Sequence, residues 1–228
     1  MASLNPITGT LGRKRALHLL KRASFGGSKA DIDQFSGMTI QEAMQQLAAP
    51  ITDPVPPIDP LTGVTWVNSA TTDANSEGGD LMGYFLSWWM DQMINKPVNL
   101  TEKITYFYHT HFTTRREVVD DSIALYHQNA LFRMYALGNF KELCKKICLD
   151  NAMLVFLDGR LNVVGRTQEN FGREFLELYT IGKGPQIGPE DYTTYTEQDV
   201  QQAARVLTGY VNDRDYITTD ADTGLKAG

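Results

Sequence analysis

The sequence predicts an all-α fold, and three observations lead to that prediction. Residues typical of helix starts recur along the chain, and the runs that follow them place apolar residues three and four positions apart. Alternating apolar and polar runs long enough to make a sheet are absent from the sequence. The predicted architecture is an irregular multi-helix domain with one long proline-rich surface loop. With 228 residues, of which 42% are hydrophobic, residues 1–228 are expected to form a single helical domain.

Five polar residues that are each followed by an acidic residue three positions later indicate where helices begin. In this capping-box pattern the first side chain accepts a hydrogen bond from a backbone N–H, and the acid interacts with the positive end of the helix dipole. The pairs are Ser28 with Asp31, Thr39 with Glu42, Asn99 with Glu102, Asn139 with Glu142, and Thr196 with Asp199. Helices are expected at 12–24, 29–36, 39–48, 79–95, 100–112, 121–137, 140–149, 168–181 and 197–209. A short strand pair near Val163 or Tyr210 would leave the fold class unchanged.

Residues 50–79 do not follow the helical pattern. They contain five of the nine prolines and then a polar stretch that starts at Asn68. A loop of this length inside a compact domain is usually a covering loop or a linker. We expect a long loop that crosses the surface rather than a domain boundary, because the helices before it are too few to build an independent core.

Composition and local sequence limit which binding partners and which cellular compartment are expected. A net charge of −6 argues against a nucleic-acid binder, which usually carries a basic face. The most apolar window, 81–94, is too short to cross a bilayer and contains Asp91, so no transmembrane segment is expected. Cys144 and Cys148 lie four apart on one predicted helix and are expected to pack in the core rather than form a disulfide. No signal peptide is visible at the N-terminus, which makes the cytoplasm the default compartment.

Several phrases along the chain resemble a known family when they are taken together and in order. They are LHLLKRASFG at 17–26, YHTHF at 108–112, ALGNF at 136–140, DNAML at 150–154, ENFGRE at 169–174, TEQDV at 196–200 and LTGY at 207–210. In this order they resemble the bacterial family catalogued as domain of unknown function eighteen hundred, from about residue 12 to the end of the chain. The resemblance implies a largely helical bacterial protein without an established activity. Because relatives are typically much longer and often look exported, it also implies that this chain is an N-terminal portion and leaves its compartment open.

A histidine and two glutamates lie on helix faces that are expected to be buried. His111 lies on the apolar stripe of its predicted helix. On the predicted helix 168–181, Asn170, Glu174 and Glu177 follow the spacing i, i+4, i+7 and therefore share one face. Apolar residues surround that face widely, which is typical of a buried helix. Buried carboxylates require partners, so the sequence predicts a site around these side chains.

Two kinds of partner fit these carboxylates. One is a divalent metal, because imidazole and carboxylate suit zinc, iron or manganese, with His111, Glu174 and Glu177 as ligands. His109 is the candidate fourth ligand, but residues two apart point about 200° apart on a helix. A helix that ends or distorts near Thr110 would be needed to bring both histidines inward. The other partner is arginine, which binds carboxylates in bidentate fashion. The candidates are Arg115, Arg116, Arg133, Arg173 and Arg205.

Two functions follow from these alternatives. The first is a scaffold or interaction domain with a buried His/Glu/Arg network, for which another protein is the expected partner. The second is a metal-binding enzyme, hydrolytic or redox, in which His109 is a fourth ligand or a proton shuttle. The sequence contains no phosphate-binding glycine loop, no G-x-S-x-G and no H-E-x-x-H motif. The lack of a complete catalytic motif favours the first function.

Overall fold

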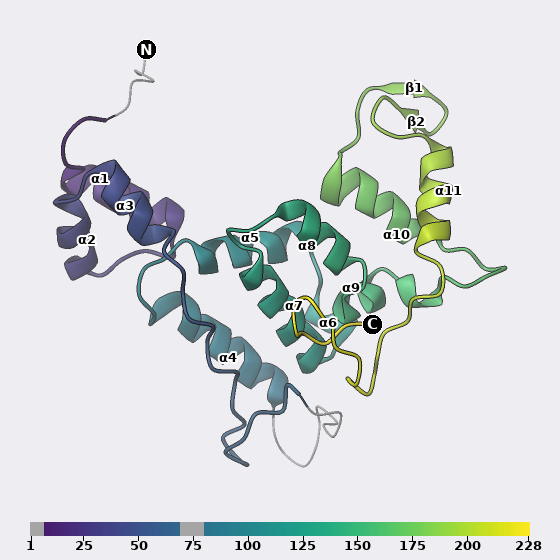
Figure 1. Ribbon diagram of the computed structural model, residues 1–228, viewed down its shortest axis with the longest axis horizontal. Helices are drawn as coiled ribbons and strands as arrows, with labels where there is room; N and C mark the ends of the chain where they lie inside the picture. The colour runs from purple at the N-terminus through teal and green to yellow at the C-terminus, as the bar shows by residue number, and fades with distance from the viewer. Residues whose placement is uncertain (1–6, 69–79) are drawn as a thin grey trace.

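The computed structural model describes residues 7–68 and 80–228, and helices dominate it (Figure 1). The α-helices are α1 (Gly12–Ala23), α2 (Lys29–Ser36), α3 (Ile40–Leu47), α4 (Leu81–Ile94), α5 (Thr101–Phe112), α6 (Arg116–Val119), α7 (Ser122–Met134), α8 (Phe140–Ile147), α9 (Asn151–Phe156), α10 (Glu169–Glu174) and α11 (Glu197–Val206). A 3₁₀ turn, η2 (Gly159–Leu161), and a π-helix, η3 (Phe175–Thr180), complete the helical set. Two short strands, β1 (Gln186–Gly188) and β2 (Asp191–Tyr192), pair antiparallel. The predicted helical fold class is confirmed.

All nine predicted helices are found, and the differences lie in short elements. Helices α6 and α9 have four and six residues, too few to give a periodic signal, and the sequence did not predict them. The region predicted as one helix at 168–181 is α10 followed by the π-helix η3. The strand pair lies at 186–192 instead of near Val163 or Tyr210, although Val163 forms an isolated bridge with Arg166.

All five predicted cap residues accept a hydrogen bond from a backbone N–H of the first turn, although Asn99 lies one residue before the N-cap of α5, Leu100. In two of the five pairs the acid binds a different side chain. Ser28, Thr39 and Thr196 form complete capping boxes with the predicted acids. Asn99 accepts a hydrogen bond from the backbone N–H of Glu102 at 3.2 Å, while the Glu102 carboxylate binds Arg133. Asn139 likewise caps α8, and its expected partner Glu142 binds Lys145. A cap is a local feature, whereas a carboxylate binds whichever donor the packing brings closest.

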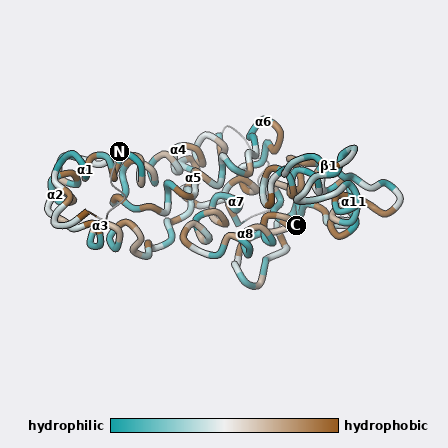
Figure 2. The backbone as a smooth tube through the Cα atoms, turned by 90° about the horizontal axis from the view of Figure 1, so that it is seen from above, coloured by the Kyte–Doolittle hydropathy of each residue, from teal (hydrophilic) through white to brown (hydrophobic). Residues whose placement is uncertain are grey.

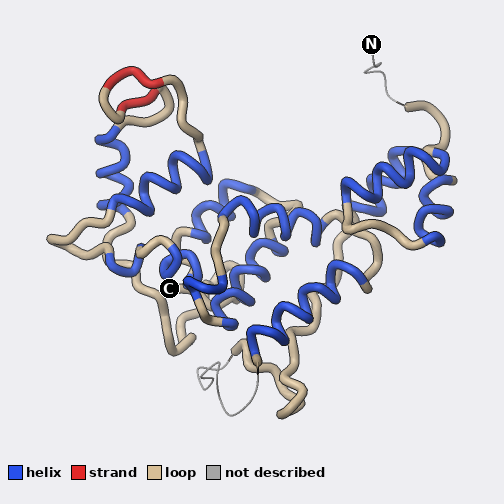
Figure 3. Tube along the Cα trace, turned by 180° about the vertical axis from the view of Figure 1, so that it is seen from behind, coloured by secondary structure: helices blue, strands red, loops and turns tan. Residues whose placement is uncertain are grey.

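Three clusters of buried apolar side chains hold the helices together. The first joins α1, α2 and α3 around Leu20 and Phe35. The second lies between α4, α7 and α9 and includes Trp66 of the long loop. The third packs α5, α7, α8 and α10 around Phe112 and Phe132. Figures 1 and 3 show α1–α3 at one end of the molecule and α10, α11 and the β-hairpin at the other, with α5 and α7 between them. The expectation of a single domain over 1–228 stays a prediction.

The long loop is fastened to the helices that it crosses. Residues 50–68 form no helix or strand, as predicted, while 69–79, the rest of the predicted loop, lie outside the described residues. Trp66 donates a hydrogen bond from its indole N–H to the Ser122 hydroxyl at 3.0 Å. In the other direction, Trp88 of α4 donates to the carbonyl of Val55 at 2.8 Å. These two contacts place the loop over α4 and α7.

Membrane-spanning length is not reached by any helix in the part of the chain that the structure describes. The longest α-helix there, α4, has 14 residues, whereas a helix needs about 20 to cross a bilayer. Figure 2 shows hydrophobic and hydrophilic residues interspersed along the helices instead of one continuous apolar segment.

Candidate functional site

His111 lies at the end of α5 and faces the π-helix. The helix ends at Phe112 because the next residue, Thr113, takes a left-handed backbone conformation with φ of 56°. His111 Nε2 lies 2.9 Å from the carbonyl oxygen of Tyr179 in η3. A carbonyl can only accept, so His111 Nε2 carries a hydrogen and is the donor of this hydrogen bond. The ring therefore stabilises the C-terminal end of the π-helix, where backbone carbonyls lack helical partners.

Glu174 and Glu177 lie on either side of the change from α-helix to π-helix. Glu174 is the last residue of α10, and η3 begins at Phe175. A π-helix has a wider turn than an α-helix, so the α-helical spacing that placed both glutamates on one face does not continue beyond Glu174. The prediction of a regular helix to residue 181 is therefore wrong in its second half. Both glutamates are half-buried rather than enclosed in the core.

Among the described residues Glu177 has two side-chain partners, and neither is an arginine. Tyr195 donates its hydroxyl hydrogen to Glu177 Oε2 at 2.6 Å, and Lys183 Nζ lies 3.0 Å from Oε1. The Tyr195 hydrogen bond, followed by Lys183, lowers the pKa of the Glu177 carboxyl below its usual value despite some burial. Burial and the nearby carboxylate raise the pKa of Tyr195 to about 12, so the phenol stays a donor at neutral pH. Arg173 binds Glu197 instead, at 2.8 Å.

His109 lies on the opposite side of α5 from His111, as the spacing of two residues predicts. It packs edge-on against Trp89 of α4, with ring centroids 5.1 Å apart. Burial lowers the pKa of His109, which keeps the ring neutral at neutral pH. Within 7–68 and 80–228, no three His, Cys, Asp or Glu side chains are grouped closely enough to hold a metal ion. The metal site predicted for His111, Glu174, Glu177 and His109 stays a prediction without support from this geometry.

The buried glutamate–arginine pair of the described chain lies elsewhere, between α5 and α7. Arg133 donates from Nε to Glu102 Oε1 at 2.5 Å and from Nη2 to Oε2 at 3.1 Å. The two side chains are 4% and 5% exposed. The Arg133 guanidinium also lies over the ring of Trp88, 5.2 Å from its centroid. Arg133 was among the arginines proposed from the sequence, but Glu102 was expected there only as the acid of the capping box that starts at Asn99.

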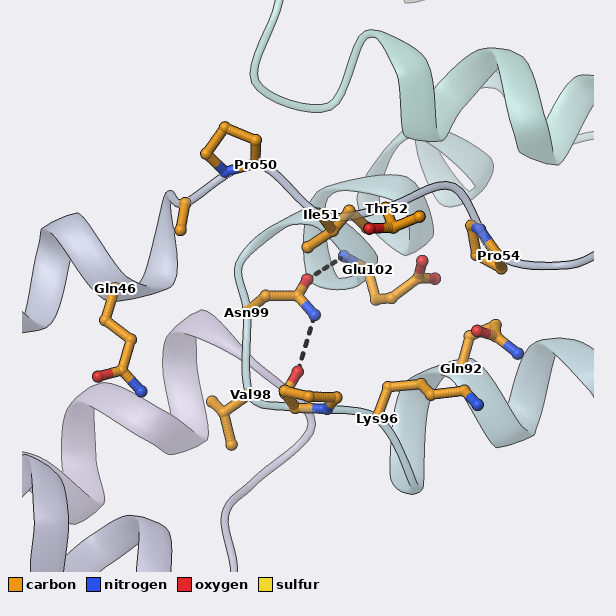
Figure 4. A pocket seen from close by; sticks show the side chains of 12 residues that line it. Gln46, Pro50, Ile51, Thr52, Pro54, Gln92, Lys96, Val98, Asn99 and Glu102 are labelled. Atoms are coloured by element: carbon orange, nitrogen blue, oxygen red, sulfur yellow. Dashed lines mark hydrogen bonds between the residues drawn. The ribbon is translucent and has the colours of Figure 1, made fainter.

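Glu102 forms part of the wall of a cavity of about 500 Å³ (Figure 4). The cavity lies between the end of α3, the loop that follows it, and the α4–α5 connection. Figure 4 labels Asn99 and Glu102 in this wall. Asn99 accepts a hydrogen bond from the backbone N–H of Glu102 and donates one to the carbonyl of Pro97 at 2.8 Å. A neighbouring cavity of about 340 Å³ shares Gln92, Lys96 and Glu102 and extends to the start of α2. Because Arg133 compensates its charge, Glu102 contributes to this wall as a paired group rather than as a reactive acid.

A third feature is an apolar groove between α8, η3 and α11, with a volume of about 640 Å³. Most of its lining side chains are apolar; they include Phe140, Cys144, Cys148, Phe175, Leu176, Ile181, Ala203, Val206 and Leu207. Lys141 and Lys145 also line it, from α8. Both cysteines are free thiols, and burial raises the pKa of Cys144 to about 11 and that of Cys148 to about 12. Protonated thiols of this kind behave as small apolar side chains, as the sequence predicted for them.

A comparison with known families decides what kind of chain carries these features. The model of the family described as "Protein of unknown function (DUF1800)" matches residues 18–226. The chain belongs to the DUF1800 family. No curated protein and no solved structure matches it. The DUF1800 description gives no activity.

Two features of this DUF1800 chain were not recognised from its sequence. The Glu102–Arg133 pair joins residues 31 positions apart, and the groove is formed by three helical segments from distant parts of the chain. The sequence signal for the groove lies in α8, where Lys141 and Lys145 are four residues apart, as are Cys144 and Cys148. This spacing places the two members of each pair on the same side of a helix.

Proposed function

We propose that this DUF1800 chain is a helical interaction domain that binds an amphipathic helix of another protein in the groove between α8, η3 and α11. The observation that carries the proposal is the groove itself, an apolar depression of about 640 Å³ that is open to solvent. Val206 is 75% exposed and Ile181 is 52% exposed along it. Continuous apolar surface of this kind is typical of protein interaction sites, and a helix that places its apolar face in a groove is a recurrent way to cover it.

The charge at the groove favours an acidic partner. Lys141 and Lys145 lie four residues apart on α8, on the same side of the helix, and both line the groove. Lys145 is also bound to Glu142, at 2.8 Å, which reduces but does not reverse the local positive charge. A helix with apolar residues on one face and glutamates beside them would therefore bind more tightly than the same helix with lysines.

The paired state of the charged residues also supports an interaction domain rather than an enzyme. Glu102 is bound by Arg133, and Glu177 is bound by Lys183 and Tyr195. Carboxylates held in this way position helices and are poorly placed to act as bases or metal ligands. The alternative, a metal-binding enzyme with zinc, iron or manganese at His111, Glu174, Glu177 and His109, is tested by metal analysis in the Discussion.

The test measures the binding of two designed helical peptides by fluorescence anisotropy. Both peptides carry leucines on one face, and they differ only in having glutamates or lysines beside that face. We expect the glutamate peptide to bind saturably and the lysine peptide to bind at least about tenfold more weakly, a difference of about 1.4 kcal/mol. Reversing the basic residues with Lys141→Glu and Lys145→Glu should reverse this preference.

Two exposed valines provide matched variants for the same test. Val206→Glu places a charge in the groove and should abolish binding. Val164→Glu introduces the same change at a residue that is 93% exposed in the loop after η2, and it should leave binding unchanged. The proposal is contradicted if neither peptide binds, or if both variants bind the glutamate peptide as well as the unmodified protein does.

A further inference from the structure

A pocket separate from the groove lies between α4, α5, α6 and α7, and it contains polar groups that have no hydrogen-bond partner among the described residues. Its volume is about 290 Å³. Trp89 and His109 line it from α4 and α5, Asn129 from α7, and Arg115 and Arg116 from the start of α6. Pockets for small organic molecules start at about 300 Å³, so this one has room for a small ligand only.

Asn129 is unusual because its polar side chain is buried in this pocket without a hydrogen bond to another described residue. It is 4% exposed, and neither its amide nitrogen nor its amide oxygen has a hydrogen-bond partner in the described chain. The indole N–H of Trp89, a residue that is 7% exposed, is also without a partner there. A buried polar group left unpaired costs about 1–3 kcal/mol, and folded proteins keep few of them. Three such atoms on two residues of one pocket indicate that a molecule other than the chain supplies their partners.

The buried polar residues that precede Asn129 on α7 have hydrogen-bond partners, so the lack of partners is specific to the pocket. Gln128, the residue before Asn129, receives a hydrogen bond from Thr114 and donates one to Asp150 at 2.6 Å. His127, two residues before Asn129, is hydrogen-bonded at both of its ring nitrogens. Gln128 and His127 are thus hydrogen-bonded within the protein, whereas Asn129 has no such partner in residues 7–68 and 80–228.

The guanidinium groups at the pocket define the charge of the ligand. Arg115 and Arg116 are exposed and line the pocket together with one acid, Glu117. The arginines that form ion pairs in the described residues are Arg13, Arg133 and Arg173. Arg115 and Arg116 are therefore available to an anion, and guanidinium groups bind carboxylates with two parallel hydrogen bonds. The edge-on contact with His109 fixes the Trp89 indole against the pocket.

We propose that this pocket binds a small organic acid, with its carboxylate at Arg115 and Arg116 and a hydroxyl or amide group at its other end. That second group hydrogen-bonds to the Asn129 amide and to the Trp89 indole N–H. The apolar side chains of Phe85, Leu86 and Leu125 line the pocket as well and enclose the carbon skeleton between the two polar ends. The assignment is independent of the helix-binding groove, which is formed by other elements.

The experiment titrates the whole chain with 4-hydroxybenzoate by isothermal calorimetry, with the neutral 4-hydroxybenzamide as the matched probe. We expect saturable binding of the acid and at least about tenfold weaker binding of the amide. Asn129→Leu should weaken binding of the acid roughly tenfold or more, because one hydrogen-bonded end is lost. The combined Arg115→Gln and Arg116→Gln variant should lose binding, whereas Arg214→Gln, at an exposed arginine outside the pocket, should retain it.

Several outcomes would overturn the proposal. One is a wild-type protein that gives no saturable heat with 4-hydroxybenzoate. Another is affinity that is unchanged in a folded Asn129→Leu variant. Trp89→Phe, which removes the indole N–H but keeps an aromatic ring, serves as the second variant if the leucine variant does not fold. A third is inorganic phosphate that binds as tightly as 4-hydroxybenzoate and abolishes its heat of binding, which would reduce the site to a surface patch that attracts anions.

Discussion

Arg133 binds Glu102 through two hydrogen bonds, of 2.5 and 3.1 Å, and both side chains are almost fully buried. The pair joins the first turn of α5 to the last turn of α7, next to the cavity of Figure 4. Two charges in such a place compensate each other, but the loss of one leaves the other unpaired in a medium that solvates it poorly.

We therefore expect Glu102→Gln to lower the free energy of unfolding by about 3–5 kcal/mol. The double variant Glu102→Leu with Arg133→Met should recover most of that loss, because no charge is then left in the core. Urea denaturation measures the free energy of unfolding of the single and the double variant. Glu142→Gln, at the exposed pair with Lys145, is the control and should cost about 0.5 kcal/mol or less. Equal effects of Glu102→Gln and Glu142→Gln would show that the buried pair is not strongly coupled.

Asp150 should make the protein less stable as the pH rises through the acidic range. Burial raises the pKa of this carboxyl from its ordinary value of 3.8 to about 7. Between these values the folded protein holds a proton that the unfolded chain has released, so stability present below about pH 4 is lost as the pH rises to about 7. Asp150→Asn cannot ionise and keeps an acceptor oxygen for Met153 N–H and Gln128.

The expected result is that Asp150→Asn gains stability relative to wild type as the pH rises from 4 to 7, by up to about 1.4 kcal/mol per pH unit. Chemical denaturation across this range measures the difference in the free energy of unfolding between the two proteins. A difference that does not change with pH would mean that Asp150 titrates in the folded protein as it does in the unfolded chain.

His127 should make the protein less stable as the pH falls, which is the opposite of the effect of Asp150. The pH ranges of the two effects overlap. Its Nε2 lies 2.8 Å from the carbonyl of Val67, and its Nδ1 accepts a hydrogen bond from the backbone N–H of Lys226 at 3.3 Å. Burial lowers the pKa of His127 from 6.5 to about 4. Its stabilising contribution is therefore complete above about pH 6.5 and is lost as the pH falls to about 4.

We expect His127→Gln to lower the free energy of unfolding at pH 7 and to lower it less at pH 4, so that the variant and wild type converge. The physical reason is that protonation of Nδ1 would place a second N–H against that of Lys226. Denaturation curves at the two pH values give both differences. Curves that stay equally far apart would show that His127 does not change its charge in this range.

Metal analysis separates the two functions that the sequence allowed. His111 Nε2 already donates to Tyr179, and the Glu177 oxygens are bound by Lys183 and Tyr195, so we expect no stoichiometric zinc, iron or manganese in purified, tag-free protein. Elemental analysis of wild type and of the His111→Ala, Glu177→Ala double variant is the measurement. Near-stoichiometric metal that is lost in a folded double variant would contradict the interaction domain and support the metal enzyme.

The sequence predicted the candidate site around His111, Glu174 and Glu177 less accurately than it predicted the fold. His111 and His109 were expected on different sides of one helix, and they contact different elements, Tyr179 and Trp89. The glutamates were placed by α-helical spacing, which the π-helix at Phe175–Thr180 changes. Nothing in a single sequence distinguishes these six residues from a further turn of α-helix, because the apolar pattern of a short segment is compatible with both.

What the sequence determined by itself was the position and type of the long helices. Ser28, Thr39 and Thr196 each fix a helix start through groups only three residues away, and such local hydrogen bonds do not depend on the rest of the fold. The tertiary structure alone decided which charged groups pair. Glu102 meets Arg133 from 31 positions away, and Glu177 meets Tyr195 from 18. These contacts form only when packing brings the helices together, since any donor that arrives at bonding distance satisfies a carboxylate.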